Sequence, residues 1–312
     1  MTLASTLKTV RATAFDGGWN LPLWVAQEHG FFANRGLNVL ISYASNSALL
    51  LAELASGKQD IALAAADNFI AYSEGQVART TDSAAIRIVM GGDGGFLSLV
   101  AAPGIDGLAD LAGRRVSVDS MSTGFAFVLR ELLARAGLTA SDVAIESAGG
   151  TSSRYGALIA GHHAATLLRT PYELQARAKG FVRLAGTESI GAYHGTVGAV
   201  REDWAREHAS VVVAFLRGYR DAMDWLADAR HHPAAQALLA SHIPGLGDAL
   251  AADSLALLLA PGVGLRPDLS IDTRGLKTVL GLRSQFGEPR RHLTDTARYV
   301  DHGFLEQAFA GR

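Results

Sequence analysis

The feature that most constrains the fold of this chain is an alternation of two hydropathy patterns along its first two thirds. Short runs of apolar and β-branched residues, such as residues 37–43, are followed by helical patterns that end at a glycine, as residues 46–56 do before Gly57. Strands that alternate with helices in this way are typical of βαβ units and a mainly parallel sheet. The predicted strands are residues 8–15, 37–43, 60–65, 86–91, 96–101, 114–119, 143–147, 164–168, 181–185 and 196–200.

The last third of the chain carries helical patterns only, so it must pack back on the α/β part. Pro103-Gly104 marks a loop where the chain can cross between lobes, and residues 196–200 fit the return crossing. A chain of 312 residues suits two lobes better than one domain. We expect an α/β protein with residues 1–100 and 200–312 as lobe one and residues 101–199 as lobe two. The predicted helices are residues 21–34, 46–56, 68–74, 122–136, 152–160, 203–229, 234–241, 248–259, 272–286 and 295–309, with another that starts at Thr170-Pro171.

Composition argues against several classes of protein. The net charge of −2 leaves no basic surface for nucleic acid or an anionic membrane. The absence of cysteine excludes disulfides, thiolate metal sites and cysteine nucleophiles. No apolar run approaches the roughly 18 residues that a transmembrane helix needs. The start of the chain lacks the basic and apolar regions of a secretory signal, so either a signal has been removed or the protein stays in the cytoplasm.

No motif for a cofactor or a metal stands out. Residues 91–95, Gly-Gly-Asp-Gly-Gly, match neither a P-loop nor a dinucleotide-binding fingerprint. The neighbouring pairs His162-His163 and His231-His232 would diverge by about 100° on a helix, so we expect them on the surface rather than on one metal ion. We predict no cofactor, no metal and no catalytic residue.

Five groups of residues follow one another in a familiar order. They are Phe-Asp-Gly-Gly-Trp at 15–19 with Gly-Phe-Phe at 30–32 and Gly-Leu at 36–37, Leu-Ala-Ser-Gly-Lys-Gln-Asp-Ile-Ala at 54–62, Leu-Ala-Asp-Leu-Ala-Gly-Arg-Arg-Val at 108–116, Ala-Leu-Ile-Ala-Gly at 157–161, and Thr-Pro-Tyr at 170–172. This order resembles the substrate-binding proteins for sulfonates, nitrate-type anions, taurine and thiamine-precursor pyrimidines. The resemblance covers roughly residues 15–225.

The resemblance implies a type II periplasmic-binding-protein fold, with a ligand enclosed between two lobes by hinge closure. It also implies an ABC permease and its ATPase as partners, and ligand contacts at the helix start Ser122-Thr123-Gly124. The chain departs from the resembled proteins at Arg169, where they generally carry a small or acidic residue. Enzymes on this fold that the chain resembles distantly depend on cysteine, which this chain lacks.

Ligands of open α/β sheets bind beyond the carboxyl ends of the strands, and this rule selects residues without help from the resemblance. Glycine lets the backbone approach a ligand closely, and Trp19 offers a flat apolar face. Polar residues at helix starts lie beside free backbone N–H groups that are available to a ligand. Capping of the helix alone explains the presence of these polar residues equally well. The predicted ligand-binding residues after the first strands are Asp16, Gly18, Trp19, Asn20, Ser45, Asn46, Asp67, Asn68, Asp93 and Phe96.

In the second lobe, hydroxyl groups and a helix N-terminus coincide, and this combination favours a carboxylate, sulfonate or phosphate-like oxygen. The residues of this predicted anion site are Ser122, Thr123, Gly124 and Phe125. Arg169 either grips a ligand carboxylate with its planar guanidinium or pairs with an aspartate when the lobes close. Arg154, Tyr172 and His194 are further predicted contacts.

Asp16, Asp67 and Asp93 complicate the binding of an anion. Three carboxylates at neighbouring strand ends would repel an anionic ligand unless arginine or protons neutralise them. A ligand that carries an acidic group together with an amino or ring N–H group would satisfy both sets of residues.

We therefore predict a binding protein, expected as a monomer, that captures a small organic acid for an ABC importer. The acid would be a sulfonate or an aromatic or heteroaromatic carboxylate, with Trp19 and Phe125 as stacking walls. The periplasm is the expected compartment, with the cytoplasm as the alternative. Three other functions stay open: binding of thiamine-precursor pyrimidines, a cytoplasmic ligand sensor, and a decarboxylase or isomerase that uses Asp16 or His194.

Overall fold

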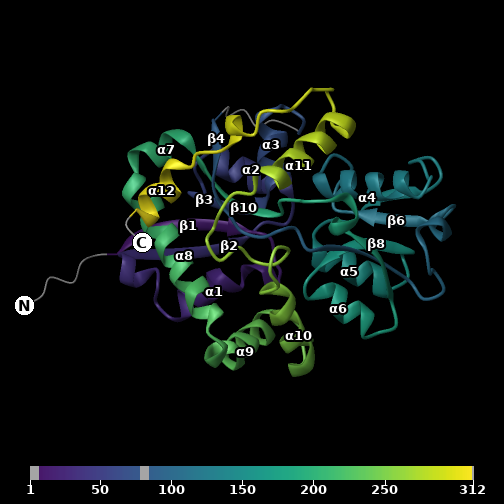
Figure 1. Cartoon of the computed structure of the whole chain (residues 1–312), viewed down its shortest axis with the longest axis horizontal. Helices are drawn as coiled ribbons and strands as arrows, with labels where there is room; N and C mark the ends of the chain where they lie inside the picture. Colours follow the sequence, from purple (N-terminus) through teal and green to yellow (C-terminus); the bar gives the residue numbers. More distant parts are fainter. Residues whose placement is uncertain (1–6, 78–83, 311–312) are drawn as a thin grey trace, which may run out of the picture.

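The computed structural model describes residues 7–77 and 84–310 and contains two five-stranded sheets that lie side by side (Figure 1). The first sheet has the strand order β2-β1-β3-β10-β4 and, with its helices, forms lobe one. The second sheet has the order β7-β6-β8-β5-β9 and forms lobe two. The strands are β1 Lys8–Ala14, β2 Leu37–Tyr43, β3 Ile61–Ala65, β4 Ile86–Gly91, β5 Leu97–Ala101, β6 Arg115–Val118, β7 Ala144–Ser147, β8 Ala165–Arg169, β9 Val182–Gly186 and β10 Thr196–Arg201.

Each sheet is mixed, because one strand runs against the other four. In lobe one this strand is β10, which pairs antiparallel with both β3 and β4. In lobe two it is β5, which pairs antiparallel with both β8 and β9. These are the two strands with which the chain enters its new lobe, after β4 and after β9. The remaining pairs, β1 with β2 and β3, and β6 with β7 and β8, are parallel, as the alternating pattern predicts.

Helices flank both sheets, and the helical last third of the chain packs on lobe one (Figure 1). Within the described ranges, no helix combines the length and apolar character needed to cross a bilayer. The longer helices are α1 Leu21–Glu28, α2 Ser47–Ala55, α3 Ala66–Ser73, α4 Gly124–Arg135, α5 Thr151–Ile159, α6 Tyr172–Arg177, α7 Glu202–Glu207, α8 Ala209–Ala227, α9 His232–His242, α10 Asp248–Leu258, α11 Thr273–Phe286 and α12 Gly303–Phe309. Short 3₁₀ helices lie at Gly18–Asn20, Ala33–Arg35, Leu108–Leu111, Thr187–Ile190, Ala229–His231 and Ala297–Tyr299.

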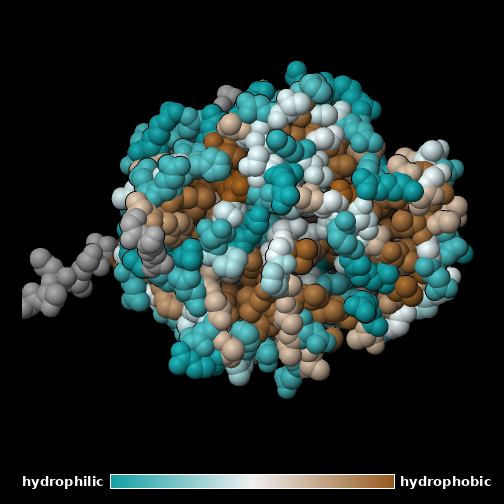
Figure 2. All heavy atoms as spheres, in the orientation of Figure 1, coloured by the Kyte–Doolittle hydropathy of each residue, from teal (hydrophilic) through white to brown (hydrophobic). Residues whose placement is uncertain are grey.

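Two large apolar cores, with a smaller third cluster in lobe two, hold the described part of the chain together, and one of the large cores extends across both lobes. In lobe one, α8 packs against α1 and α12, and its Phe215 stacks on Phe32 with ring centroids 5.0 Å apart. The other core joins the strands of both sheets through α4 and α11, where Phe127 lies 5.9 Å from Phe286. Figure 2 shows hydrophilic residues over much of one face, with hydrophobic residues visible in the recesses between them. The lobes therefore share buried surface on the α4–α11 side.

Three predicted helices are wrong in extent. The helix predicted at residues 21–34 ends at Glu28, because Gly30 takes a left-handed backbone with φ of 68°. The helix predicted at residues 203–229 is broken at His208, whose φ of −122° and ψ of 32° lie outside the helical range. Its ring stacks on Trp204 at 5.1 Å and its Nδ1 lies 3.1 Å from the Trp204 carbonyl oxygen, which holds the break in place.

The third is the helix predicted at residues 295–309, which is α-helical only at its end, in α12, and contains the short 3₁₀ helix Ala297–Tyr299 before it. Val300 forms a parallel bridge with Ile88 of β4, and the N–H of Asp301 donates to the Ile88 carbonyl oxygen at 2.9 Å. The edge of the first sheet thus supplies backbone partners that compete with the helix.

Candidate ligand-binding site

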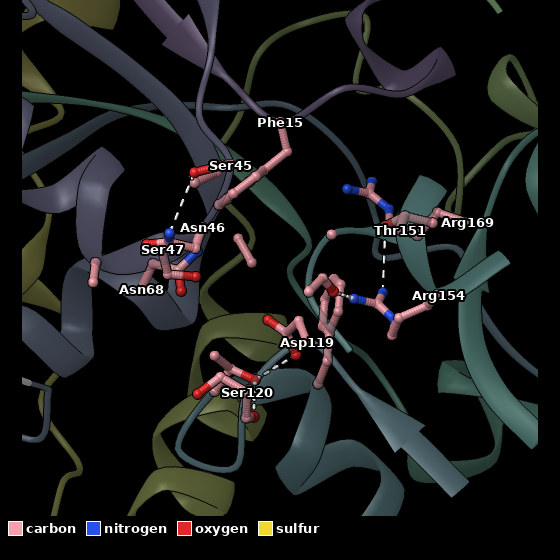
Figure 3. Close-up of a pocket in the computed structure, with 18 of the residues that line it drawn as sticks. Phe15, Ser45, Asn46, Ser47, Asn68, Asp119, Ser120, Thr151, Arg154 and Arg169 are labelled. Carbon is pink, nitrogen blue, oxygen red and sulfur yellow. Dashed lines mark hydrogen bonds between the residues drawn. The ribbon is translucent and has the colours of Figure 1, made fainter. Parts of the chain in front are cut away.

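A cavity of about 350 Å³ lies between the two lobes, at the carboxyl ends of strands from both sheets. This is the position that the topology of an open α/β sheet favours for a ligand. Figure 3 shows polar side chains facing one another across this space. The cavity is lined by Phe15, Trp19, Ser45, Asn46, Ser47, Ala48, Ala64, Ala65, Asn68, Val77, Asp119, Ser120, Ser122, Thr123, Gly124, Phe125, Gly149, Gly150, Thr151, Arg154, Arg169 and Thr196.

The wall contributed by lobe one consists of aromatic and amide side chains that follow β1, β2 and β3. Phe15 and Trp19 come directly after β1 and supply the apolar part. Asn46 follows β2, and its Oδ1 accepts the N–H of Leu49 at 2.9 Å, which fixes the start of α2. Such a cap satisfies one of the free N–H groups and leaves others at the helix start available.

The wall contributed by lobe two carries the charged groups. Asp119 follows β6, and Thr123 Oγ1 donates to its Oδ1 at 2.6 Å. Arg154 of α5 has only 1% of its surface exposed. Its guanidinium donates to the carbonyl oxygens of Leu167, at 3.1 and 3.2 Å, and of Gly149, at 2.5 Å. None of the salt bridges in the described part of the chain includes Arg154, although Asp119 on the same wall acts on its charge from beyond salt-bridge distance.

The N-terminal turns of four helices reach this cavity, namely those of α2, α3, α4 and α5. Each helix start carries partial positive charge from unpaired N–H groups and the helix dipole. The N-cap residues of α4 and α5, Thr123 and Gly150, make no side-chain capping bond, although Asp67 accepts the N–H of Gly124 at the start of α4. The arrangement is suited to an anionic group.

Arg169 is paired with an aspartate, the second of the two roles considered for it from the sequence, and it also lines the cavity. Its Nη2 donates to Asp93 Oδ2 at 2.6 Å and its Nη1 to Thr196 Oγ1 at 3.0 Å. The guanidinium lies over the rings of Trp19, at 4.1 Å, and Phe96, at 4.6 Å. Burial alone would raise the pKa of Asp93, but Arg169 and the surrounding hydrogen bonds hold that pKa below its usual value. The guanidinium that Arg169 presents to the cavity is therefore part of an ion pair with no net charge.

Asp67 is neutralised in the same way, by an arginine far along the chain. Arg283 of α11 is fully buried and donates to Asp67 Oδ1 and Oδ2 at 2.6 and 2.7 Å. Asp67 Oδ2 also accepts the N–H of Gly124 at 2.6 Å, while Arg283 donates to the Ser122 carbonyl oxygen at 2.8 Å. This buried cluster of lobe one thus fixes the start of α4 in lobe two.

Asp16 of lobe one forms a contact with lobe two. Tyr172 of lobe two donates its hydroxyl to Asp16 Oδ2 at 3.4 Å. Burial raises the pKa of Asp16, and the bond from Tyr172 and the nearby His242 oppose that rise only in part. Asn20 points its amide nitrogen at the Phe15 carbonyl oxygen, at 2.6 Å, and so shapes the loop rather than the cavity.

His194 is fully buried, and neither of its ring nitrogens has a hydrogen-bond partner among the residues that the structure describes. Burial lowers its pKa from 6.5 to about 4, a shift that Asp93 partly opposes. Between these values the unfolded chain binds a proton that the folded protein excludes, so stability decreases as the pH falls. We expect a loss of about 3 kcal/mol in the free energy of unfolding across this window, from about 1.4 kcal/mol per pKa unit.

Urea denaturation at pH 7 and pH 4.5 measures this loss. The variant His194→Leu should lack the His194 contribution and show a shallower dependence on pH. An unchanged dependence in the variant would show that other groups cause it.

The structure brings many of the predicted ligand-binding residues to one cavity, but not all of them. Those on its wall are Trp19, Ser45, Asn46, Asn68, Ser122, Thr123, Gly124, Phe125, Arg154 and Arg169. Those that do not line it are Asp16, Gly18, Asn20, Asp67, Asp93, Phe96, Tyr172 and His194. Several of the latter support the wall from behind, since Asp93 and Phe96 contact Arg169 and Asp67 contacts Gly124.

Sequence reasoning missed several residues of the wall. The polar ones are Ser47, Asp119, Ser120, Thr151 and Thr196. Asp119 and Ser120 follow β6, and Gly149-Gly150-Thr151 lies between β7 and α5, so the rule of strand ends would have selected both segments. We predicted Asp119 as the last residue of the strand, whereas the strand ends at Val118.

The described residues contain no group of histidine and carboxylate side chains suited to a metal ion. The histidine pairs are engaged one by one instead. His163 lies 3.1 Å from a carboxylate oxygen of Glu146, and His231 stacks on Trp225 with ring centroids 4.4 Å apart. His162 is exposed, as predicted, whereas His163, His231 and His232 are half-buried.

Comparison with known proteins identifies the class. The model of the family described as NMT1/THI5 like matches residues 20–235, and the chain belongs to this family. Among curated proteins, none matches the chain.

Solved structures agree on the fold. A protein of Bordetella bronchiseptica RB50 is 20% identical, with 96% of each chain covered and a TM-score of 0.81. The periplasmic aliphatic sulphonate binding protein SsuA from Escherichia coli is 20% identical, with 89% of this chain and 90% of that chain covered and a TM-score of 0.66. The desulfurization enzyme DSZB is 14% identical, with 97% and 99% covered and a TM-score of 0.66. The chain therefore has the α/β, two-lobed type II periplasmic-binding-protein fold.

Proposed function

We propose that this chain is a solute-binding protein that holds a small organic acid between its two lobes and delivers it to an ABC importer. One observation carries the proposal: the wall of the cavity of about 350 Å³ contains the N-terminal turns of four helices and a buried arginine, Arg154, that forms no salt bridge with any residue the structure describes. Helix starts and an arginine both favour an oxyanion. Phe15, Trp19 and Phe125 give the same cavity an apolar part that suits an organic acid rather than a bare inorganic anion.

The neutralised aspartates support an anionic ligand. Asp67 and Asp93, which would repel an anion, are each paired with an arginine. The two crossings of the chain between the lobes allow hinge closure around the ligand. The Escherichia coli relative is described as periplasmic and as binding aliphatic sulphonates, which supports a sulfonate or carboxylate ligand and a periplasmic location. An ABC permease and its ATPase would be the partners.

A thermal-shift screen tests the proposal with a panel of alkanesulfonates, aromatic carboxylates and pyrimidines. A true ligand at about 100 times its Kd should raise the free energy of unfolding by about 2.7 kcal/mol. An acid such as benzoate should stabilise the protein, and its neutral counterpart benzamide should not. Equal stabilisation by both would contradict the proposed anion site.

Two further measurements separate binding from catalysis and test closure. Because DSZB has the same fold and is an enzyme, the bound acid should be recovered and analysed after incubation. A binding protein returns it unchanged, whereas turnover would reassign the chain to an enzyme. Small-angle scattering should show compaction when the acid is added, and its absence with a tight ligand would contradict hinge closure.

A further inference from the structure

We propose that the ligand carries a hydrogen-bond donor, an amino or ring N–H group, beside its acidic group, and that Asp119 binds this donor. The inference rests on the proposed function and narrows its ligand class from organic acids in general to those with an N–H group. It makes Asp119 the residue that determines this specificity.

The position of Asp119 is well defined. It lies immediately after β6, lines the cavity, and receives a hydrogen bond from Thr123 Oγ1 to its Oδ1 at 2.6 Å. Its main chain is also held, because the N–H of Gly149 donates to its carbonyl oxygen at 3.3 Å. Figure 3 shows the carboxylate near Ser120, on the side of the cavity that also carries Thr151 and Arg154. A rigid carboxylate on the wall accepts hydrogen bonds and donates none when it is ionised.

Asp119, which is half-buried, differs from Asp67 and Asp93, the two buried aspartates beside the cavity. Asp67 and Asp93 each have an arginine within a short salt bridge, of 2.6 Å in both cases. Among residues 7–77 and 84–310, no salt bridge includes Asp119. Burial raises the pKa of Asp119, and the charge of Arg154 and the bond from Thr123 oppose that rise only in part. A ligand N–H group would give Asp119 the stabilisation that arginine gives the other two.

The charges on the cavity wall call for two kinds of ligand group. Arg154 and the helix starts favour an oxyanion, whereas Asp119 repels one and favours a donor. A ligand with an acid only would leave Asp119 facing a like charge, and a ligand with an amine only would leave Arg154 with Asp119, outside salt-bridge distance, as its nearby negative charge. A ligand with both an acid and an N–H group gives Arg154 and Asp119 a partner each.

Matched pairs of probes test the inference. We would measure the Kd of 4-aminobenzoate against benzoate and of 2-aminoethanesulfonate against ethanesulfonate by calorimetry. In at least one pair, the aminated probe should bind about 10- to 100-fold more tightly, the usual value of a hydrogen bond to a charged group. This comparison uses the unmodified protein, so it does not depend on how a variant folds.

The variant Asp119→Asn assigns the effect to the residue. It keeps an oxygen for the Thr123 hydroxyl but removes the charge, so the preference for the aminated probe should be lost, and the amine-free probe should bind at least as tightly as before because it no longer faces a like charge. Asp142→Asn, a change of the same kind near the surface turn of lobe two, should keep the preference.

The possible failures are distinguishable. If the amine-free probes bind as tightly as their aminated partners, or if Asp119→Asn keeps the preference, the inference about Asp119 is wrong and the proposed function stands. If no acid of either kind binds, the proposed function itself is wrong.

Discussion

Replacing Arg283 with methionine is expected to lower the free energy of unfolding by about 3–5 kcal/mol. The substitution leaves the carboxylate of Asp67 buried, with the backbone N–H of Gly124 as its remaining hydrogen-bond donor among the contacts described above. An uncompensated buried charge is costly because water cannot reach it and the surrounding medium screens it poorly. Arg283 also donates to the carbonyl oxygen of Ser122, so that group loses its partner as well.

Urea denaturation of the variant measures this loss, with Arg230→Met as the matched control. Arg230 pairs with Asp228 at the surface and is 85% exposed, so water screens the pair and its removal should change the stability little. The double variant Asp67→Leu with Arg283→Met should recover much of the stability, because it removes both charges together. A loss below about 1 kcal/mol for Arg283→Met would show that the buried pair does not hold the lobes together.

The general fold follows from the sequence because hydrophobic periodicity and punctuation by glycine act locally. The strand predicted at residues 37–43 has the same bounds in the structure, and Asn46 caps the helix that follows it. Of the three helices of wrong extent, the one predicted at residues 295–309 fails for a reason that a local pattern does not contain. The backbone of Val300 pairs with the edge strand β4, more than two hundred positions earlier in the chain.

The site was harder to predict than the fold, because the sequence identifies strand ends but not the direction of each side chain. Asp67 and Asp93 do lie at strand ends, yet both point to arginines instead of the cavity. Arg283 is 216 positions away from Asp67, and no local signal links the two. The sequence did raise the relevant physical problem, since it required the three aspartates to be paired or protonated. The structure pairs two of them and raises the pKa of the third, Asp16.

The substitution Gly150→Trp is expected to weaken the binding of an organic acid by roughly 100-fold, because its large side chain overpacks the cavity. Gly150 lies on the cavity wall at the start of α5, with φ of −61°, a backbone that any residue adopts. A Cβ atom at this position would meet nothing within 4 Å. The indole of Gly150→Trp can therefore enter the space that the ligand would occupy, without strain in the main chain.

Calorimetry with the panel acid that gives the largest thermal shift measures this loss. Gly156→Trp is the matched control, because Gly156 belongs to the same helix, is exposed, and also has open space around its Cβ position. It should leave the Kd unchanged. Gly150→Ser should also bind nearly as the parent does, because serine is a good N-cap and too small to fill the cavity. If Gly150→Trp binds the acid as tightly as the parent while remaining folded, the ligand lies elsewhere and the space between the lobes is not the binding site.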